Sequence, residues 1–228
     1  MPEDAHLAIQ TLRRVPYFAD LDDETLEEVA RIAVRREYEA GEVVFCEGES
    51  CTGLHLVEKG WLKIVKLSPE GREQSLRIVG PGELFGEMGV FSCGLNPATV
   101  IALDRTVLWV ICREAMHRLL EAHPRMAWSI LQSVARRVTE LVGLIEDLSL
   151  RTVEARLARY ILRYAEGDRL RRQRWATQAE MAARLGTVLH VLNRALHTLE
   201  AEGLIAVDRQ EIRILDAEGL RAKARLYE

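Results

Sequence analysis

The sequence predicts an α+β fold that consists of an antiparallel β-roll, a long helix and a winged helix-turn-helix, in that order. Three observations point to it. Short apolar runs separated by turn residues occupy roughly residues 40–112. A heptad-like apolar pattern follows Pro124. Residues 175–215 combine two short amphipathic helices with a hairpin. We expect domains at 1–122 and 150–228, joined by a dimerisation helix at 123–149.

The composition is that of an ordinary globular chain. Of its 228 residues, 48% are hydrophobic and 29% are charged. No apolar run approaches the ~20 residues that span a bilayer, and residues 1–14 lack the apolar core of a secretory signal. We therefore expect a cytoplasmic protein without a membrane partner.

The net charge of −4 conceals an asymmetry along the chain. Residues 151–228 contain 15 Lys and Arg against 11 Asp and Glu, whereas residues 1–150 contain 16 against 24. A basic C-terminal third behind an acidic body indicates that a polyanionic partner would meet the C-terminal part. A chance distribution of charge is the alternative.

Cysteine spacing and catalytic motifs give no evidence of a metal site or an enzyme. The four cysteines form no CxxC pair, so we expect reduced structural thiols, with a redox switch or metal site as the alternative. The motifs GxSxG, HExxH and GxxxxGKS are absent. The cysteines are Cys46, Cys51, Cys93 and Cys112.

The N-terminal part predicts helices followed by strands. Residues 5–35 have the helical pattern, and residues 21–38 begin with acids and repeat apolar side chains at three- and four-residue spacing. From Gly41 the period changes to that of short strands with turns between them. The expected strands are 42–46, 53–59, 61–67, 74–79, 98–103 and 106–111.

Pro124 begins a long helix with apolar residues spaced 3-4-3-4-3, which is the seam of a coiled coil. The pattern predicts a parallel two-fold dimer. Because it lasts only about two and a half heptads, a helix packed on its own domain is the alternative. Trp128 is a candidate for packing this helix against the roll. The seam residues are Leu131, Val134, Val138, Leu141, Ile145 and Leu148.

The C-terminal part predicts a helix at 151–165, a basic polar loop at 166–174, and then a helix-turn-helix. Thr177 and Glu180 form a capping box, and Gly186 suits a left-handed turn. The second helix has a buried stripe, and a hairpin at 203–215 adds the wing. The stripe is Leu192, Ala195, Leu196 and Leu199.

The outer face of the second helix predicts contacts with double-stranded DNA. Asn193 and Arg194 suit base edges or phosphates, and Thr187 suits a phosphate. A winged helix used for protein contacts is the alternative. The candidate DNA-binding residues are Thr187, Leu189, His190, Asn193, Arg194 and His197, with Val188 on the same face.

This order of parts resembles the CRP/FNR family of bacterial transcription regulators. The resemblance covers nearly the whole chain and rests on PGELFGEMGVF, MAWSILQSVARRVTELVGLIEDL, TQAEMAARLG and LNRALHTLEAEGLI. It implies a cyclic-nucleotide-binding-like roll, a homodimer on a two-fold-symmetric DNA site, and RNA polymerase as a partner. The family's early Arg-Glu pair of the reading helix falls on Leu189 and His190, while its later Arg is matched by Arg194. No consensus site is therefore carried over.

The resemblance also places an effector pocket. In cAMP-binding members a Gly-Glu pair meets the ribose, an Arg-Ser pair the phosphate, and a Thr-Ser pair the adenine. A phosphate diester stripped of water without a cation binds poorly, so we expect a degenerate pocket and a signal other than cAMP. The corresponding residues are Gly86 and Glu87, Pro97 and Ala98 (followed by Thr99), and Leu141 and Val142.

Three alternatives stay open at this point. The first is a haem-based gas sensor, because Pro2 falls where one such sensor of the family uses an N-terminal proline ligand. Residues 84–95 lack a histidine, which leaves His55, His117 and His123 as candidates. Residues 1–45 contain no cysteine, which argues against an iron–sulfur cluster. The second alternative is a constitutive regulator without an effector. The third is a nucleotide-binding module without transcriptional output.

Overall fold

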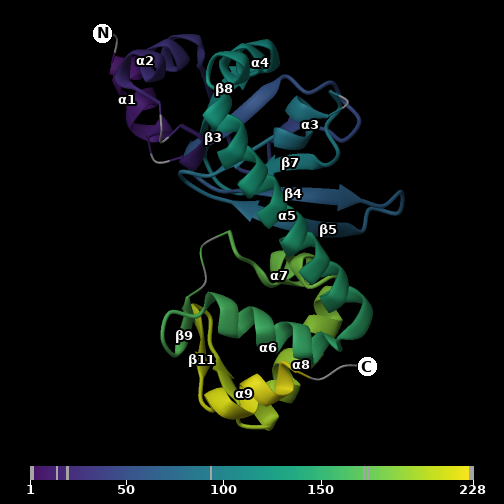
Figure 1. Ribbon diagram of the computed structural model, residues 1–228. Coiled ribbons are helices and arrows are strands. Elements are labelled where there is room, and N and C mark those ends of the chain that lie inside the picture. Colours follow the sequence, from purple (N-terminus) through teal and green to yellow (C-terminus); the bar gives the residue numbers. More distant parts are fainter. Residues whose placement is uncertain are drawn as a thin grey trace. The chain divides into compact units, whose positions relative to one another are not determined.

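The computed structural model describes residues 3–13, 15–18, 21–92, 94–171, 173 and 175–225, with side chains from Leu7 onward. The chain forms two compact units, Met1–Leu67 with Leu76–Thr139, and Ser68–Ser75 with Glu140–Glu228. Figure 1 shows the order of the elements within each. The predicted α+β fold with a roll, a long helix and a winged helix-turn-helix is confirmed. Of the helices that the structure describes, none has the length and apolar character to cross a bilayer.

The first unit begins with helices that cover one side of the roll. They are α1 (Glu3–Leu12), a 3₁₀ turn η1 (Pro16–Phe18) and α2 (Asp23–Ile32). The Asp22 side chain accepts a hydrogen bond from the Thr25 N–H at 2.9 Å and so caps α2. Leu12, Phe18 and Val29 are fully buried in one apolar cluster with roll residues.

The helical prediction for the N-terminal part extends too far. The helix ends at Ile32, Ala33 is extended, and β1 (Val34–Tyr38) pairs antiparallel with β8 (Thr106–Cys112). The pairing partner is distant in the sequence, so local periodicity does not reveal it. Tertiary pairing here overrides a helical pattern.

The roll consists of two four-stranded sheets, ordered β1-β8-β3-β6 and β2-β7-β4-β5. The registers pair neighbouring strands antiparallel, as predicted. Apolar side chains such as Phe85 and Leu108 fill one cluster between strands of both sheets. Helices α3 (Glu87–Phe91) and α4 (Arg113–Ala122) follow β6 and β8. The remaining strands are β2 (Val43–Phe45), β3 (Gly53–Lys59), β4 (Leu62–Leu67), β5 (Glu73–Val79), β6 (Leu84–Phe85) and β7 (Thr99–Ala102).

One long helix, α5 (Pro124–Leu150), joins the two units, and it begins at the predicted proline. Met126 and Ile130 are buried in the core of the first unit, and Val134 packs on it. These three residues lie four apart and form one face. Trp128 is 64% exposed instead of packing against the roll. The expectation for Trp128 was wrong. Trp128 is two residues beyond the buried Met126, and residues two apart on a helix point to opposite sides.

The second unit holds the C-terminal helices and a three-stranded sheet of order β10-β11-β9. Leu157, Ile161, Leu192 and Ile212 are fully buried in its core. The elements are α6 (Val153–Tyr164), β9 (Arg169–Arg171), α7 (Gln178–Arg184), α8 (Leu189–Ala201), β10 (Ile205–Val207), β11 (Glu211–Ile214) and α9 (Ala217–Lys223).

Two elements of this unit escape the sequence prediction. The expected loop at 166–174 contains β9, which pairs with β11. Only Leu170 of β9 is buried, and one apolar residue between arginines gives too little alternation to detect. Helix α9 was not predicted either, although Asp216 accepts bonds from the N–H groups of Glu218 and Gly219 as an N-cap.

Candidate nucleic-acid interface and effector pocket

The helix-turn-helix is formed by α7, a tight turn and α8. The Thr177 hydroxyl accepts a bond from the Glu180 N–H at 3.2 Å and caps α7 as predicted. Gly186 adopts φ +63°, and a Cβ there would overlap the Leu148 side chain. The Thr187 N–H then closes the turn by donating to the Ala182 carbonyl at 2.9 Å. The left-handed conformation favours glycine here.

Helix α8 divides into a buried and an outer face, as its periodicity predicts. Leu192, Ala195, Leu196 and Leu199 are buried. The outer residues are exposed, except that Thr187, at the preceding turn, and Asn193 are half-buried. The sequence of α8 contains a single Arg, Arg194, and no Lys. We call Thr187, Val188, Leu189, His190, Asn193, Arg194 and His197 the reading face.

The wing is the hairpin of β10 and β11 with β9 at its side. The Asp208 carboxylate accepts bonds from the Gln210 and Glu211 N–H groups at 2.7 and 2.9 Å, which fixes the turn. Arg209 lies exposed at that turn. Arg169 of β9 pairs with Glu211 at 3.3 Å. The wing therefore exposes the cation of Arg209 near the Arg169–Glu211 ion pair, in which the two charges neutralise each other.

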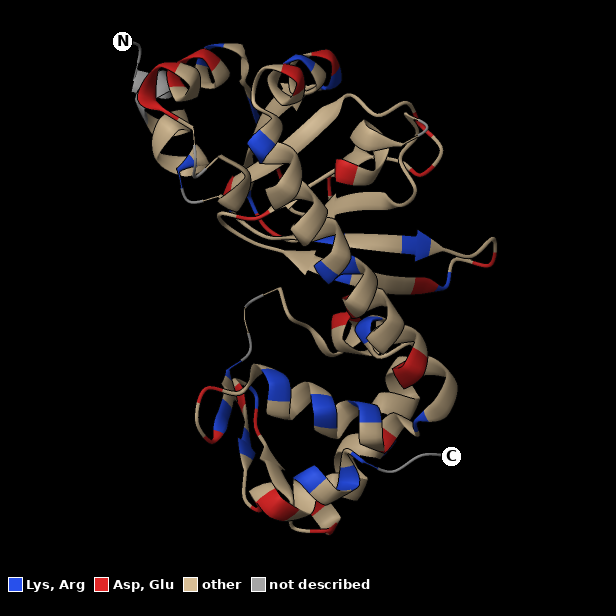
Figure 2. Ribbon diagram, viewed as in Figure 1, with Lys and Arg blue, Asp and Glu red and all other residues tan. Residues whose placement is uncertain are grey.

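Basic residues also recur along α6, where Figure 2 shows several blue segments of the ribbon in a row. Two of them have partners within the unit. Arg156 donates to the Leu185 carbonyl at 2.5 Å, and Arg159 pairs with Asp147 at 3.2 Å. These contacts hold α6 against the turn of the helix-turn-helix and the end of α5.

A buried arginine fixes the joint between α5 and α6. Arg151 pairs with Glu146 at 2.6 Å and with Asp147 at 3.0 Å, and it donates to the Ala224 carbonyl at 3.0 Å. It therefore ties the end of α5 to the residue that follows α9. Sequence reasoning missed Arg151, although an Asp four residues before an Arg on a helix is a detectable signal.

In the first unit, Gly86 and Glu87 lie where β6 passes into α3. Gly86 adopts φ +93°, and a Cβ there would lie 2.8 Å from the Gly53 carbonyl oxygen and 3.2 Å from His55 Nδ1. The chain therefore needs glycine at this position for its own packing, whatever the roll binds.

Glu87 is buried and engaged by side chains of its own unit. The Tyr17 hydroxyl donates to its Oε1 at 3.4 Å, and Arg137 Nη2 lies 4.0 Å from the same oxygen. Burial raises the pKa of the Glu87 carboxyl, which Arg137 opposes, and burial raises the pKa of Tyr17 to about 12. Tyr17 and Glu87 are 70 positions apart, so no local pattern predicts this network.

The Pro97-Ala98 segment has no side chain suited to a phosphate. Ala98 is buried and Pro97 exposed. Lys66 donates to the Pro97 carbonyl at 3.2 Å, but the same ammonium pairs with Glu47 at 2.5 Å. The Thr99 hydroxyl accepts from the Glu47 N–H at 3.0 Å. Leu141 and Val142 lie on the part of α5 that belongs to the second unit, and both are exposed.

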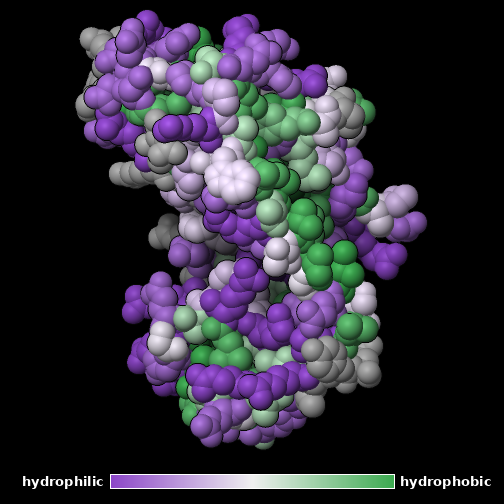
Figure 3. Space-filling model, viewed as in Figure 1, coloured by the Kyte–Doolittle hydropathy of each residue, from purple (hydrophilic) through white to green (hydrophobic). Residues whose placement is uncertain are grey.

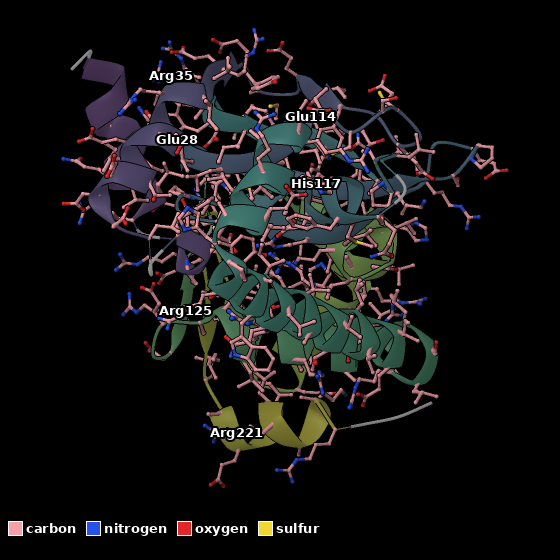
Figure 4. All side chains as sticks on the ribbon, turned by 45° about the horizontal axis from the view of Figure 1, so that its top comes forward. Glu28, Arg35, Glu114, His117, Arg125 and Arg221 are labelled. Atoms are coloured by element: carbon pink, nitrogen blue, oxygen red, sulfur yellow. The ribbon has the colours of Figure 1, made fainter. Side chains whose placement is uncertain are left out.

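Two of the candidate haem ligands are packed against other residues of the first unit. His55 is buried, stacks on Phe85 at 4.9 Å between ring centres, and faces Gly86 with Nδ1. Burial lowers the pKa of His55 to about 4, so the ring is neutral. His117 Nε2 lies 3.2 Å from the Val90 carbonyl, and Figure 4 shows His117 on α4. His123 follows α4.

Two further metal and cofactor candidates are not tested by the structure. Pro2 and Cys93 lie outside the described residues. Within the described ranges, no group of three or more His, Cys, Asp or Glu side chains is arranged to hold a metal ion.

Two family models match the chain. Residues 35–123 match the cyclic nucleotide-binding domain, and residues 155–223 match the Crp-like helix-turn-helix domain. The first match covers most of the roll and α4, and the second covers most of α6 to α9. Together they contain both candidate sites described above, apart from Tyr17 and the residues of α5.

Curated relatives and solved structures agree with these matches. A CRP-like cAMP-activated global transcriptional regulator of Mycobacterium tuberculosis is 27% identical over 95% of this chain and 99% of its own length. The cyclic AMP receptor protein of Thermus thermophilus is 29% identical over 89% and 93%. A solved structure from Eubacterium rectale, assigned to the CRP/FNR family, superposes with TM-score 0.74 at 25% identity over 94% of this chain and 100% of that one. The chain belongs to the CRP/FNR family of transcription regulators and carries its DNA-binding helix-turn-helix.

Proposed function

We propose that this chain is a homodimeric regulator that binds a two-fold-symmetric DNA site and responds to a signal other than cAMP. The proposal that the signal is not cAMP rests on the Pro97-Ala98 segment, which offers a cyclic phosphate neither a cation nor a hydroxyl. Relatives at 27 to 29% identity are named for cAMP, so the difference lies in particular residues and not in the fold.

Two features of the roll and one of α5 argue against cAMP. A buried phosphate needs a paired charge, but the nearby ammonium of Lys66 is already engaged by Glu47. Glu87 is held by Tyr17 and Arg137 instead of standing open to a ribose. Leu141 and Val142 have no polar group for an adenine.

Exposed apolar residues on α5 support the homodimer. Leu131 and Val138 are each 55% exposed and Ile145 is 63% exposed. In Figure 3 hydrophobic side chains gather along this helix. A row of apolar side chains at heptad spacing is covered by a second copy of the same helix in a coiled coil.

The other expected properties follow from family membership. RNA polymerase as a partner rests on the resemblance, and a cytoplasmic location is where a regulator that binds DNA would act. A constitutive regulator is the second candidate, because Glu87 is already held within the protein. A haem-based sensor loses support from the positions of His55 and His117. A module without transcriptional output loses support from the complete helix-turn-helix.

The proposal is tested by titrating the full chain with cAMP in a calorimeter and by measuring DNA affinity with and without it. The DNA is a site selected from randomised symmetric duplexes. We expect no binding heat up to millimolar cAMP and an unchanged DNA affinity. Micromolar cAMP binding would contradict the proposal. The double variant Pro97→Arg, Ala98→Ser is the positive comparison, since it supplies a cation and a hydroxyl.

A further inference from the structure

The reading face begins with two exposed aliphatic side chains. Val188 and Leu189 are each 45% exposed, next to the polar part of the face that contains His190 and Arg194. Exposed aliphatic side chains are stabilised when a partner covers them and removes them from water. They lie at the N-terminal end of α8, the part of a recognition helix that enters the major groove.

Local stability does not explain Val188. It is the N-cap of α8, in extended conformation with φ −109° and ψ 157°, and its side chain makes no capping bond. Ser, Thr, Asn and Asp are preferred there, because their oxygens accept from the first N–H groups, and valine is among the poor choices. The residue neither caps the helix nor packs in the core, and departures from local rules concentrate at functional sites.

The surrounding charges specify which base feature suits these side chains. The first turn of α8 contains no acidic residue, so no carboxylate is available there to accept from the amino group of cytosine. In the major groove the apolar feature of a base edge is the 5-methyl group of thymine, which aliphatic side chains contact. Arg194, one and a half turns further along, is suited to guanine or phosphate.

We propose that Leu189, with Val188 beside it, reads thymine through its 5-methyl group in each half-site. The inference rests on the proposed DNA-binding function and gives it a base preference. It places thymine at the position that the N-terminal end of α8 meets, followed along the groove by the base or phosphate that Arg194 contacts.

The test removes only the methyl group. The full chain first selects its site from randomised symmetric duplexes, and each thymine of that site is then replaced by uracil, which has the same hydrogen-bonding edge. At the thymine read by Leu189, loss of the buried methyl should weaken binding about fourfold per half-site. Uracil at thymines outside the half-sites is the control for general effects on the duplex.

Variants assign the effect to the side chains. Leu189→Ala should bind the thymine site more weakly and should bind the uracil and thymine duplexes equally. Leu215→Ala, at an exposed leucine of the same unit off α8, should keep the wild-type preference for thymine. Alanine is a strong helix former, so α8 is retained, and circular dichroism verifies this.

The outcomes separate this inference from the function on which it rests. If the protein selects a specific site but uracil is tolerated at every thymine, the inference is wrong and the function stands. If the preference for thymine persists in Leu189→Ala, another group reads the methyl and the inference is also wrong. If no sequence is selected over random DNA, the proposed function itself fails.

Discussion

Arg194 is the residue of the reading face with the strongest means of holding DNA. It is exposed, and the α8 sequence has no other Arg or Lys. A groove-facing Arg contributes about 1–3 kcal/mol when bidentate to guanine, so Arg194→Ala should lower specific affinity roughly ten- to a hundredfold. Fluorescence anisotropy on the selected site measures this loss.

The same variant shows which group Arg194 contacts. If it reads a base, preference should relax at one symmetric position. If it holds a phosphate, affinity should fall evenly across sequences and the salt slope should shrink by about one. Arg221→Ala, which removes a cation from α9 (Figure 4), is the matched control for net charge. Wild-type affinity, preference and salt slope in Arg194→Ala together would show that the reading face is misplaced.

His55 makes a prediction about acid stability. Its folded pKa is about 4, whereas an unfolded histidine has about 6.5, so the unfolded chain takes up the proton first as pH falls. The stability from the neutral buried ring is therefore present above about pH 6.5. It is lost progressively toward pH 4, by roughly 3 kcal/mol in total. His55→Phe keeps an aromatic ring against Phe85 and removes the titrating group.

Denaturant unfolding at several pH values between 4 and 7 tests this expectation. The free energy of unfolding of the wild type should fall more steeply with acid than that of His55→Phe. Any strain from the larger ring shifts the variant equally at all pH values, so the slope and not the absolute value is compared. Parallel curves would mean that the His55 pKa is not lowered by burial.

At the residue scale, the sequence predicts best where a contact depends on neighbours along the chain. The outer position of Arg194 follows from the 3.6-residue period of α8, because Leu192, Ala195 and Leu196 fix the opposite face. The Tyr17–Glu87–Arg137 network joins residues far apart, and nothing near Glu87 in the sequence marks its partners.

At the scale of elements, two matched variants separate the part of α5 that packs on the first unit from the exposed part that follows it. Val134 packs on the core of the first unit, while Val138 is 55% exposed. Val138→Glu should leave the monomer folded and break the dimer, because it puts like charges across the seam. Val134→Glu should lower the thermal stability of the first unit, because it places a carboxylate against an apolar core.

Sedimentation velocity and thermal unfolding together distinguish the two effects. Leu67→Glu, at an exposed leucine of β4, is the control for adding one acid to the surface. If the Val138→Glu protein remained a dimer, the apolar seam of α5 would not form the dimer interface.

Element types followed from the sequence where periodicity is strong and failed where pairing decides. The long run of α5 and the alternating strands of the roll were predicted correctly. Strand β1 was read as helix because its pairing with β8 is non-local, and β9 was read as loop because Leu170 is its one buried side chain. Strands formed by tertiary pairing carry little local signal.

For the whole molecule, α5 is a helix that contains residues of both units. Its first turns are fixed to the first unit by Met126 and Ile130. Its last turn is fixed to the second unit by Glu146 and Asp147, through Arg151. The units divide between Thr139 and Glu140. In the proposed homodimer, a change in how two α5 helices pair would therefore act on a helix that is attached to both cores.

The proposed homodimer makes a prediction about the spacing of the DNA site. Two reading helices related by a two-fold axis meet half-sites one helical turn apart, about 10–10.5 base pairs between centres. Inserting five base pairs between the selected half-sites rotates one by about half a turn. One α8 then faces away from its half-site, and affinity should fall to that of a duplex with a single half-site. Base substitutions at the centre without a change in length are the control. Val138→Glu, as a monomer, should bind the original and the lengthened duplex equally. If the wild type tolerated the insertion, its two reading helices would not be held in one dimer, and the coiled-coil seam on α5 would lose its function.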